Sequence, residues 1–341
     1  MQVRAKLNHA QILSTLSSND NSKDQGGGLT NATISNHSQS PQVDTGIPQP
    51  ATHPSLHALL LLSDSALPLG SFAFSNGLES YLAHHRSRSV HSSSINPSSN
   101  LSTTSLFYSF LHLSILNTAS TTLPFLFATF RDPARLEECD DVFDATLSCT
   151  VARRASTAQG RALVGVWEKS FAAALPGFHP STPAIATLKA LAQRLRAHPT
   201  VAAPSKAPSN ALETPKTHAH FAPAFGAAAA SMELGEHETA YVFLLSHAKA
   251  VVSAGVRAGV LGPFAGQGVL AGTGIFGMKG ERKGEEGVEE GGAVSFGLRK
   301  LIEECILRER ETSVEEAGIT VPAMDLWQGR HELLYSRIFN S

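Results

Sequence analysis

Cysteine and charge are scarce in this chain of 341 residues. Its three cysteines, Cys139, Cys149 and Cys305, form no C-x-x-C pair, which argues against a disulfide scaffold and a structural zinc finger. Charged residues make up 16 % of the chain, against roughly 25 % in a typical globular domain. The formal net charge of −2 supplies neither a basic surface for nucleic acid nor a polybasic membrane anchor. We therefore expect a reduced, cytoplasmic protein that binds no nucleic acid and no membrane.

The sequence also lacks a clear targeting or membrane-spanning segment. Residues 1–10 contain no apolar run of the length that a signal peptide needs. The longest charge-free apolar stretch, 258–278, contains Pro263 and seven glycines and has few large aliphatic side chains. Because a membrane helix needs about 20 predominantly apolar residues, this composition does not favour one.

Motifs of nucleotide-binding and hydrolytic enzymes are missing or out of context. GTGIFG at 272–277 fits G-x-G-x-x-G, but no strand pattern precedes it, and a run rich in Gly, Glu and Lys follows where a helix should begin. No G-x-x-x-x-G-K-[ST] occurs, so binding of GTP or ATP through a P-loop is not expected. No G-x-S-x-G marks a serine hydrolase. We assign no catalytic residue and expect the protein not to be an enzyme.

Fifteen histidines raise the question of a metal site. They are densest at His84-His85 and at His218-Ala219-His220, but no H-E-x-x-H is present and no carboxylate-rich stretch completes either cluster. We interpret these histidines as surface or loop residues and assign no metal ligand. A weak, transient contact stays open as an alternative, because imidazole suits Ni²⁺.

Low-complexity segments divide the chain. Residues 1–54 are rich in Ser, Asn, Gln, Thr and Gly and predict a disordered tail, because they cannot bury enough apolar area to fold. Similar tracts near 87–105, 198–216 and 277–292 predict flexible loops. The remainder of 55–341 then forms a single domain.

The segments between these loops have helical periodicity. Apolar residues recur at three- and four-residue steps in 151–175, 240–255 and 296–311. Asp132-Pro133 is a helix start, with an Asp cap and Pro at the first helical position. Alternating strand patterns joined by N-G or D-G turns are missing. The sequence therefore predicts an all-α fold, a single compact helical domain.

Three segments contain residue types that packing in a hydrophobic core does not require. Residues 59–82 contain two helical stretches around a Pro-Leu-Gly turn, the second carrying Glu79. In 152–163, Arg154 and Arg161 are seven residues apart and so share a helix face. The third is the end of the chain, which is rich in the residue types of interface hot spots: Trp327, Arg330, His331, Tyr335, Arg337 and Phe339.

These segments carry a resemblance to a known family. LLLLSDSALPLGSFAFSNGLE at 59–79 resembles the N-terminal signature of the F-type urease accessory proteins (UreF), and ARRASTAQGRAL at 152–163 resembles their central helix. HFAPAFG at 220–226, the stretch 241–267 and MDLWQGRHELLYSRIFNS at 324–341 resemble the following blocks, in family order. The insertions between them suggest a eukaryotic, fungal member.

The resemblance implies an all-helical, dimeric protein with no turnover of its own. Members of the family bind the D-type accessory protein (UreD, also called UreH) and recruit the nickel-carrying G-type GTPase (UreG). The complex delivers Ni²⁺ to apo-urease, and a role in regulating GTP hydrolysis is proposed for the family. We therefore expect no tightly bound cofactor and Ni²⁺ handled in transit by the complex.

Partner-binding residues follow from the same segments. Glu79, Arg154 and Arg161 are the candidates for contact with the G-type GTPase, and the aromatic and basic residues of 324–341 for contact with the D-type protein. Two other classes stay open from the sequence: an enzyme with an unrecognised active site, and a generic helical scaffold.

Overall fold

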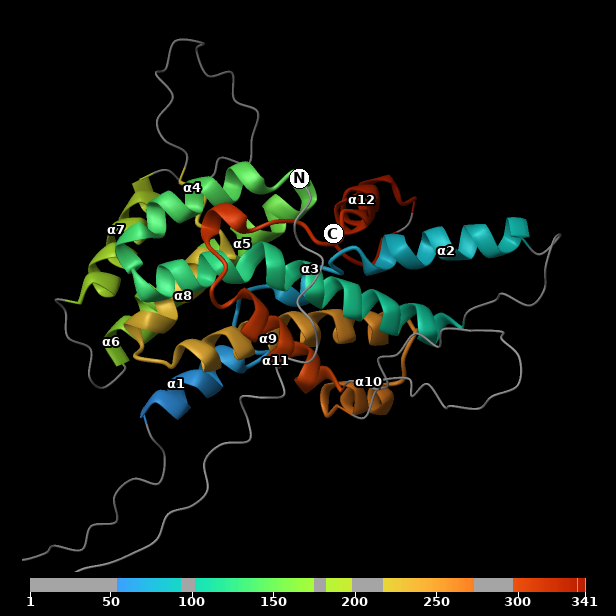
Figure 1. Cartoon of the computed structure of the whole chain (residues 1–341), viewed down its shortest axis with the longest axis horizontal. Helices are drawn as coiled ribbons and strands as arrows, with labels where there is room; N and C mark the ends of the chain where they lie inside the picture. The colour runs from blue at the N-terminus through green and yellow to red at the C-terminus, as the bar shows by residue number, and fades with distance from the viewer. Residues whose placement is uncertain are drawn as a thin grey trace, which may run out of the picture. The chain divides into compact units, whose positions relative to one another are not determined.

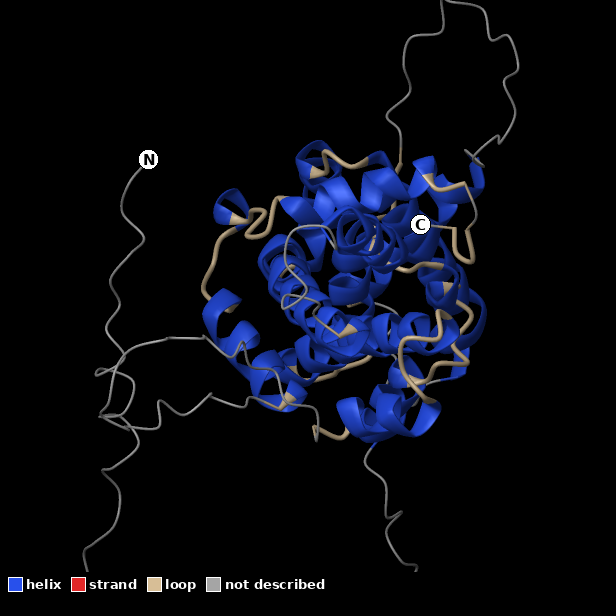
Figure 2. Ribbon diagram, turned by 90° about the vertical axis from the view of Figure 1, so that its right-hand side faces the viewer, coloured by secondary structure: helices blue, strands red, loops and turns tan. Residues whose placement is uncertain are grey.

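Regular structure in the described part of the chain is entirely helical (Figures 1 and 2). The computed structural model describes residues 54–92, 102–174, 182–197, 217–272, 297–335 and 337–340, which belong to one compact unit. The prediction of an all-α fold is confirmed for these residues. Their helices are α1 (Pro54–Ser63), α2 (Leu78–Ser92), α3 (Thr103–Arg131), α4 (Leu136–Thr146), α5 (Thr150–Val166), α6 (Ala172–Ala174), α7 (Pro183–Ala197), α8 (Phe221–Ser231), α9 (Glu236–Arg257), α10 (Pro263–Leu270), α11 (Leu298–Glu309) and α12 (Ala323–Arg330).

Helix α8 lies at the centre because its side chains are small. Its sequence, FAPAFGAAAAS, buries nine of eleven residues against α3, α5 and α7. A Cβ on Gly226 would lie 2.3 Å from the carbonyl oxygen of Leu126, so only glycine lets α3 and α8 approach this closely. Where they meet, the Thr129 hydroxyl donates to the carbonyl of Pro223 at 2.9 Å. The apolar core therefore forms around the α3–α8 contact.

A proline inside α3 determines where the C-terminal part of the chain crosses the domain. Pro124 has no N–H, so the carbonyl of Ser120 lacks its helical partner. The N–H of Gly318 donates to that carbonyl at 3.2 Å, and the N–H of Val321 donates to Oδ1 of Asn117 at 3.0 Å. The segment before α12 is thereby fixed on α3, and α12 comes to pack against α2 and α5 (Figure 1).

The helices predicted from periodicity are present. The stretch 151–175 contains α5, which continues as a π-helical turn at Trp167–Phe171, while α9 and α11 occupy 240–255 and 296–311. The Asp132 carboxylate accepts the N–H of Ala134 at 3.1 Å and so caps the short 3₁₀ turn before α4. The residues before GTGIFG form helix α10, not the strand that a dinucleotide site would need.

The low-complexity segments fall mainly outside the described residues. The predicted tail lies outside them up to residue 53, as do the loop at 198–216 and the one at 277–292. The stretch 87–105, where a loop was expected, is helical at both of its ends. Helix α2 extends to Ser92 and α3 begins at Thr103, so only 93–101 of this stretch lie outside the description.

Among the residues that the structure describes, two helices are long and apolar enough to cross a membrane by length and composition. They are α3 and α9, with mean hydropathies of 1.2 and 1.3 over their most apolar windows. Within the structure 56 % and 61 % of these windows are buried. Because the core helices of a globular domain have the same composition, burial accounts for their apolar character.

Candidate functional site

The last helix, α12, is anchored through its apolar side chains. Met324 is buried, and the Trp327 ring stands edge-on to Tyr81 with their centroids 4.6 Å apart. Trp327 also lies against Phe110 of α3, at 6.2 Å between ring centroids. The hydroxyl of Ser80 donates to the Trp327 carbonyl. One face of α12 is therefore part of the core between α2 and α3.

The chain beyond α12 is fastened by two charged groups of the folded domain. Glu79 in the first turn of α2 accepts a hydrogen bond from Nε2 of the buried His331 at 2.9 Å and another from the N–H of Ile338 at 2.9 Å. The guanidinium of Arg257 lies over the Phe339 ring, 4.3 Å from its centroid, a contact worth about 1 kcal/mol. The terminal segment is thus held in one conformation by its own domain.

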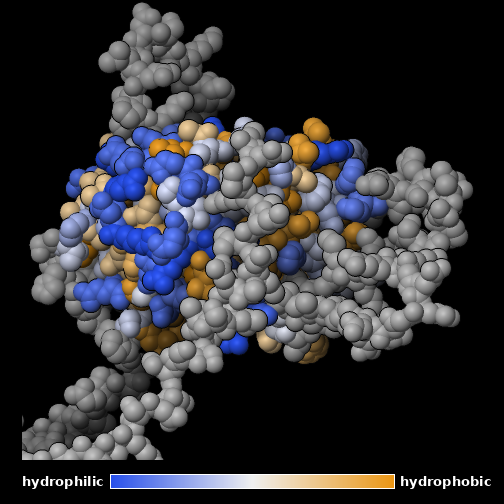
Figure 3. Space-filling model, in the orientation of Figure 1, coloured by the Kyte–Doolittle hydropathy of each residue, from blue (hydrophilic) through white to orange (hydrophobic). Residues whose placement is uncertain are grey.

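Held this way, the segment presents apolar and basic side chains to solvent. The N–H of Asn340 donates to the carbonyl of Ala73 at 2.8 Å, which brings the end of the chain beside the exposed Phe72. In the part of the surface near α12, hydrophobic side chains lie beside hydrophilic ones (Figure 3). We call the exposed set the C-terminal surface: Phe72, Leu326, Arg330, Leu333, Tyr335, Arg337 and Ile338.

The structure divides the expected D-type contact residues into two groups. Arg330, Tyr335 and Arg337 are exposed on the C-terminal surface. By contrast, Trp327, His331 and Phe339 point into the domain and hold the segment in place. The sequence could not separate the groups, because aromatic anchors and aromatic contact residues have the same composition.

The three residues expected to face a GTPase also divide. Arg154 is largely exposed and pairs with Glu332, beside the C-terminal surface. Glu79 is occupied by the terminal segment, and Arg161 donates to the carbonyls of Thr217 and His218. The structure therefore brings Arg154 and Glu79 to the same side of the molecule as α12, and turns Arg161 toward its own chain.

A second group of functional side chains lies where residues 217–221 cross α5. Ala219 has a φ of +57°, a left-handed conformation that costs a non-glycine residue about 1 kcal/mol. The carboxylate of Asp140 accepts the N–H groups of Ala219 at 2.8 Å and of His220 at 2.6 Å, which stabilises this bend. Gly160 permits the close crossing, since a Cβ there would lie 2.0 Å from the carbonyl oxygen of Ala219.

The bend places two histidine rings beside one carboxylate. Oδ1 of Asp144 lies 3.0 Å from Nε2 of His220 and 3.3 Å from Nδ1 of His218, and the two rings stack with centroids 5.6 Å apart. The other ring nitrogen of His220 lies 3.1 Å from the hydroxyl of Ser156. Burial lowers the pKa of His220, against the opposing effect of Asp140 and Asp144.

Sequence reasoning found the two histidines but not the carboxylate. Asp144 lies on α4, more than 70 positions from His218, so no local spacing connects them. The expectation that no carboxylate completes the cluster is corrected by the fold. A usable signal was Gly160 within 152–163, because a small residue in a helix marks close approach of another backbone.

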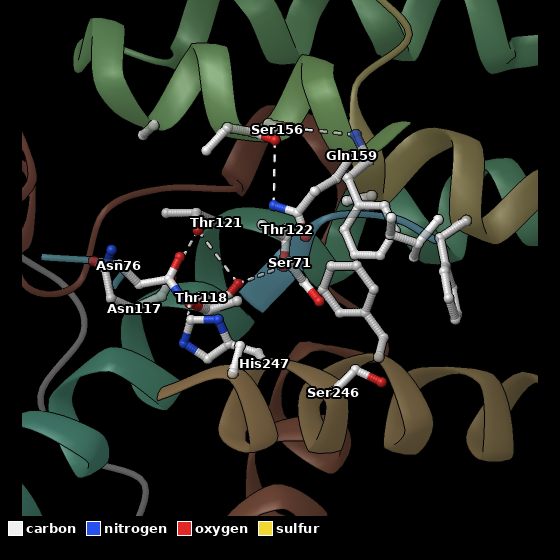
Figure 4. A pocket seen from close by; sticks show the side chains of 18 of the residues that line it. Ser71, Asn76, Asn117, Thr118, Thr121, Thr122, Ser156, Gln159, Ser246 and His247 are labelled. Carbon is white, nitrogen blue, oxygen red and sulfur yellow. Dashed lines mark hydrogen bonds between the residues drawn. The ribbon is translucent and has the colours of Figure 1, made fainter. Parts of the chain in front are cut away.

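A cavity of about 540 Å³ lies between α3, α5, α8 and α9 (Figure 4). Its wall is mainly apolar, and hydroxyl and amide side chains are interspersed in it. Nε2 of His247 lies 2.8 Å from the Ser114 hydroxyl and 3.3 Å from that of Thr118. The labelled polar side chains are Ser71, Asn76, Asn117, Thr118, Thr121, Thr122, Ser156, Gln159, Ser246 and His247.

His247 is half-buried beside the cavity, and its partial removal from solvent predicts a pH-dependent stability. Burial lowers its pKa from 6.5 to about 4, so the unfolded state takes up the proton first as the pH falls. The free energy of unfolding is therefore highest above about pH 6.5, and it falls progressively as the pH drops toward 4. For one such group we expect a loss of roughly 2 kcal/mol at pH 5, from 1.36 kcal/mol per pKa unit.

Urea unfolding of the wild type and His247→Gln at pH 7 and pH 5 checks this. The wild type should lose more stability between the two pH values than the variant does. His220 and His112, whose pKa values burial also lowers, remain in both proteins and cancel in the comparison. Equal losses would contradict a lowered pKa of His247.

The described residues form a helical domain with exposed apolar and basic side chains near the end of the chain, and exposed apolar patches mark interaction sites in proteins. Comparison with known sequences identifies the family to which the chain belongs. The family model UreF matches residues 105–273. A protein of Schizosaccharomyces pombe named "Uncharacterized urease accessory protein UreF-like" is 32 % identical over 285 residues, covering 84 % of this chain and 97 % of that protein.

More distant relatives have the same kind of name. Urease accessory protein F of Oryza sativa is 26 % identical, with 82 % of each chain covered. Urease accessory protein 6 of Cryptococcus neoformans is 24 % identical, over 84 % of this chain and 97 % of that protein. The chain belongs to the UreF family of urease accessory proteins. Its family membership supports a role in urease maturation.

Proposed function

We propose that this chain is a non-catalytic assembly factor that bridges a D-type accessory protein (UreD/UreH) and the nickel-carrying G-type GTPase (UreG) on apo-urease, in the cytoplasm. Family membership supports this role. The sequence contains no P-loop, so the partner supplies the nucleotide chemistry. In this proposal Ni²⁺ passes through the complex, the chain acts as a homodimer, and it regulates GTP hydrolysis by its partner.

The observation that carries the proposal is the C-terminal surface. Leu333, Tyr335 and Ile338 expose 80 %, 106 % and 61 % of their area, although they sit on a segment that Glu79 and Arg257 hold in place. A surface that is apolar, flanked by arginines and already ordered loses little conformational entropy when a partner binds. We assign it to the D-type partner.

Arg154 is the residue we assign to the G-type partner. Its side chain is 62 % exposed and pairs with Glu332, which a carboxylate of a partner can replace. The generic-scaffold and enzyme alternatives do not explain why a fixed apolar surface stays exposed. Hydrolysis of GTP by the purified chain alone would favour the enzyme.

Co-purification tests the D-type assignment. The full chain with Leu333→Ser, Tyr335→Ser and Ile338→Ser should bind the D-type protein at least tenfold more weakly, because a few apolar anchors carry most of an interface energy. Its melting temperature should stay unchanged, since these side chains are exposed. The control is Leu307→Ser on α11, which removes another largely exposed leucine outside the C-terminal surface.

The same assay separates the partners. Arg154→Ala should weaken recruitment of the G-type protein and leave the D-type protein bound. Reconstituted urease activation should fall with either variant. Full retention of both partners by the triple variant and by Arg154→Ala would refute these assignments.

A further inference from the structure

The side chains Asp144, His218 and His220 converge in a way that ordinary loop histidines do not. Their three ligand atoms, one carboxylate oxygen and two ring nitrogens, all lie within 4.8 Å of one another. Ligands bound to Zn²⁺ at about 2.0–2.2 Å stand roughly 3–3.5 Å apart in a tetrahedral site. The two contacts of Asp144, at 3.0 and 3.3 Å, are already in that range.

The surrounding groups hold the two rings in this orientation. Ser156 contacts Nδ1 of His220 and also accepts the N–H of Phe221 at 3.2 Å, so Nε2 faces Asp144. Arg161 donates from Nε to the carbonyl of His218 at 3.2 Å and fixes the backbone under that ring. A partner on the second ring nitrogen, as Ser156 is for His220, is a common feature of histidines that ligate metals.

The left-handed conformation of Ala219 also supports a functional site at these histidines. An extended or helical backbone at 219 would avoid the conformational cost, yet the clasp by Asp140 maintains the bend. Strained backbone of this kind concentrates at functional sites. Here its effect is to bring His218 onto the same carboxylate as His220.

From this arrangement we propose that Asp144, His218 and His220 form an exchangeable site for a late first-row divalent metal ion of the Zn²⁺ and Ni²⁺ class. Two imidazoles and one carboxylate suit such ions, and three protein ligands leave a coordination position for water or a partner's donor. The side chains of Asp144 and His218 are 16 % and 23 % exposed, which gives the ion a route from solvent. The site does not depend on the bridging role proposed above.

Arg153 makes the site exchangeable. Its Nε lies 3.3 Å from Oδ1 of Asp144 and has no hydrogen-bond partner there, while its Nη2 donates to the carbonyls of Asp144 and Leu147 at 2.9 and 2.7 Å. A metal ion must therefore compete with one guanidinium for the carboxylate. Removing this guanidinium should raise the metal affinity of a metal site, and this separates such a site from a hydrogen-bonded Asp–His cluster.

Titration of the metal-free full chain with ZnCl₂ and NiCl₂ by calorimetry tests the proposal. The wild type should bind one ion at this site with micromolar affinity. Asp144→Asn and His218→Asn should each weaken it at least tenfold, and Arg153→Gln should strengthen it severalfold. The control is His237→Asn, which breaks the exposed His237–Glu303 pair at 2.7 Å and should change nothing.

Other histidines can also bind metal, because the chain has 15 of them. The ion at this site is therefore the one that the His237→Asn protein still binds and the His218→Asn protein does not. Thermal unfolding of each metal-free variant confirms that it is folded. His218→Asn binding like the wild type, or Arg153→Gln binding more weakly than the wild type, would overturn the proposal. So would a wild type that binds no ion at millimolar metal.

Discussion

Replacing Gly160 with alanine is expected to destabilise the protein by about 3 kcal/mol or more, the upper end of the range for overpacked cores. The added Cβ would lie 2.0 Å from the carbonyl oxygen of Ala219, 2.6 Å from the carbonyl carbon of His220 and 2.8 Å from the nitrogen of Phe221. These are backbone atoms, so rotation of a side chain cannot relieve the clash. The segment must move off α5, and with it the two hydrogen bonds to Asp140.

Gly165 is the matched control on the same helix. A Cβ there meets nothing within 4 Å. Because glycine inside a helix is less stable than alanine by about 0.5–1 kcal/mol, Gly165→Ala should stabilise the protein slightly. Urea unfolding of the two variants should therefore give shifts of opposite sign. A Gly160→Ala protein as stable as the wild type would mean that residues 217–221 do not cross α5 as described.

The contrast between these two glycines shows what sequence reasoning could and could not reach. The helices were predictable because their apolar residues repeat locally, as in α5, α9 and α11. Gly160 and Gly165 look alike in that pattern. Only the position of the 217–221 segment, set by packing of α8, makes one of them indispensable.

The candidate sites, too, were predictable from local sequence only in part. His218 and His220 were identified as a cluster, and the composition of 324–341 marked an interaction segment. The carboxylate that faces the histidines comes from α4, and the one that holds His331 comes from α2, 252 positions away. Contacts at such separations depend on the tertiary fold, so periodicity and spacing carry no record of them.

Deleting residues 324–341 is expected to lower stability and partner binding together. The deletion removes the buried Met324, His331 and Phe339, and it uncovers Tyr81 and Phe110 where Trp327 now packs. Losing several buried large side chains costs about 2–5 kcal/mol for each one, so the truncated chain should be poorly folded. The burial of these anchors therefore argues against a helical core that the deletion leaves intact.

Comparison with point variants resolves the two roles of the segment. His331→Ala should lower the melting temperature, because it removes one of the two hydrogen bonds that described residues donate to the largely buried Glu79 carboxylate. Tyr335→Ser should leave the melting temperature unchanged and weaken D-type binding, since that ring is fully exposed. A truncated chain that melts like the wild type would contradict the anchoring by Met324, His331 and Phe339. If His331→Ala and Tyr335→Ser lowered stability equally, the division between anchors and C-terminal surface would be wrong.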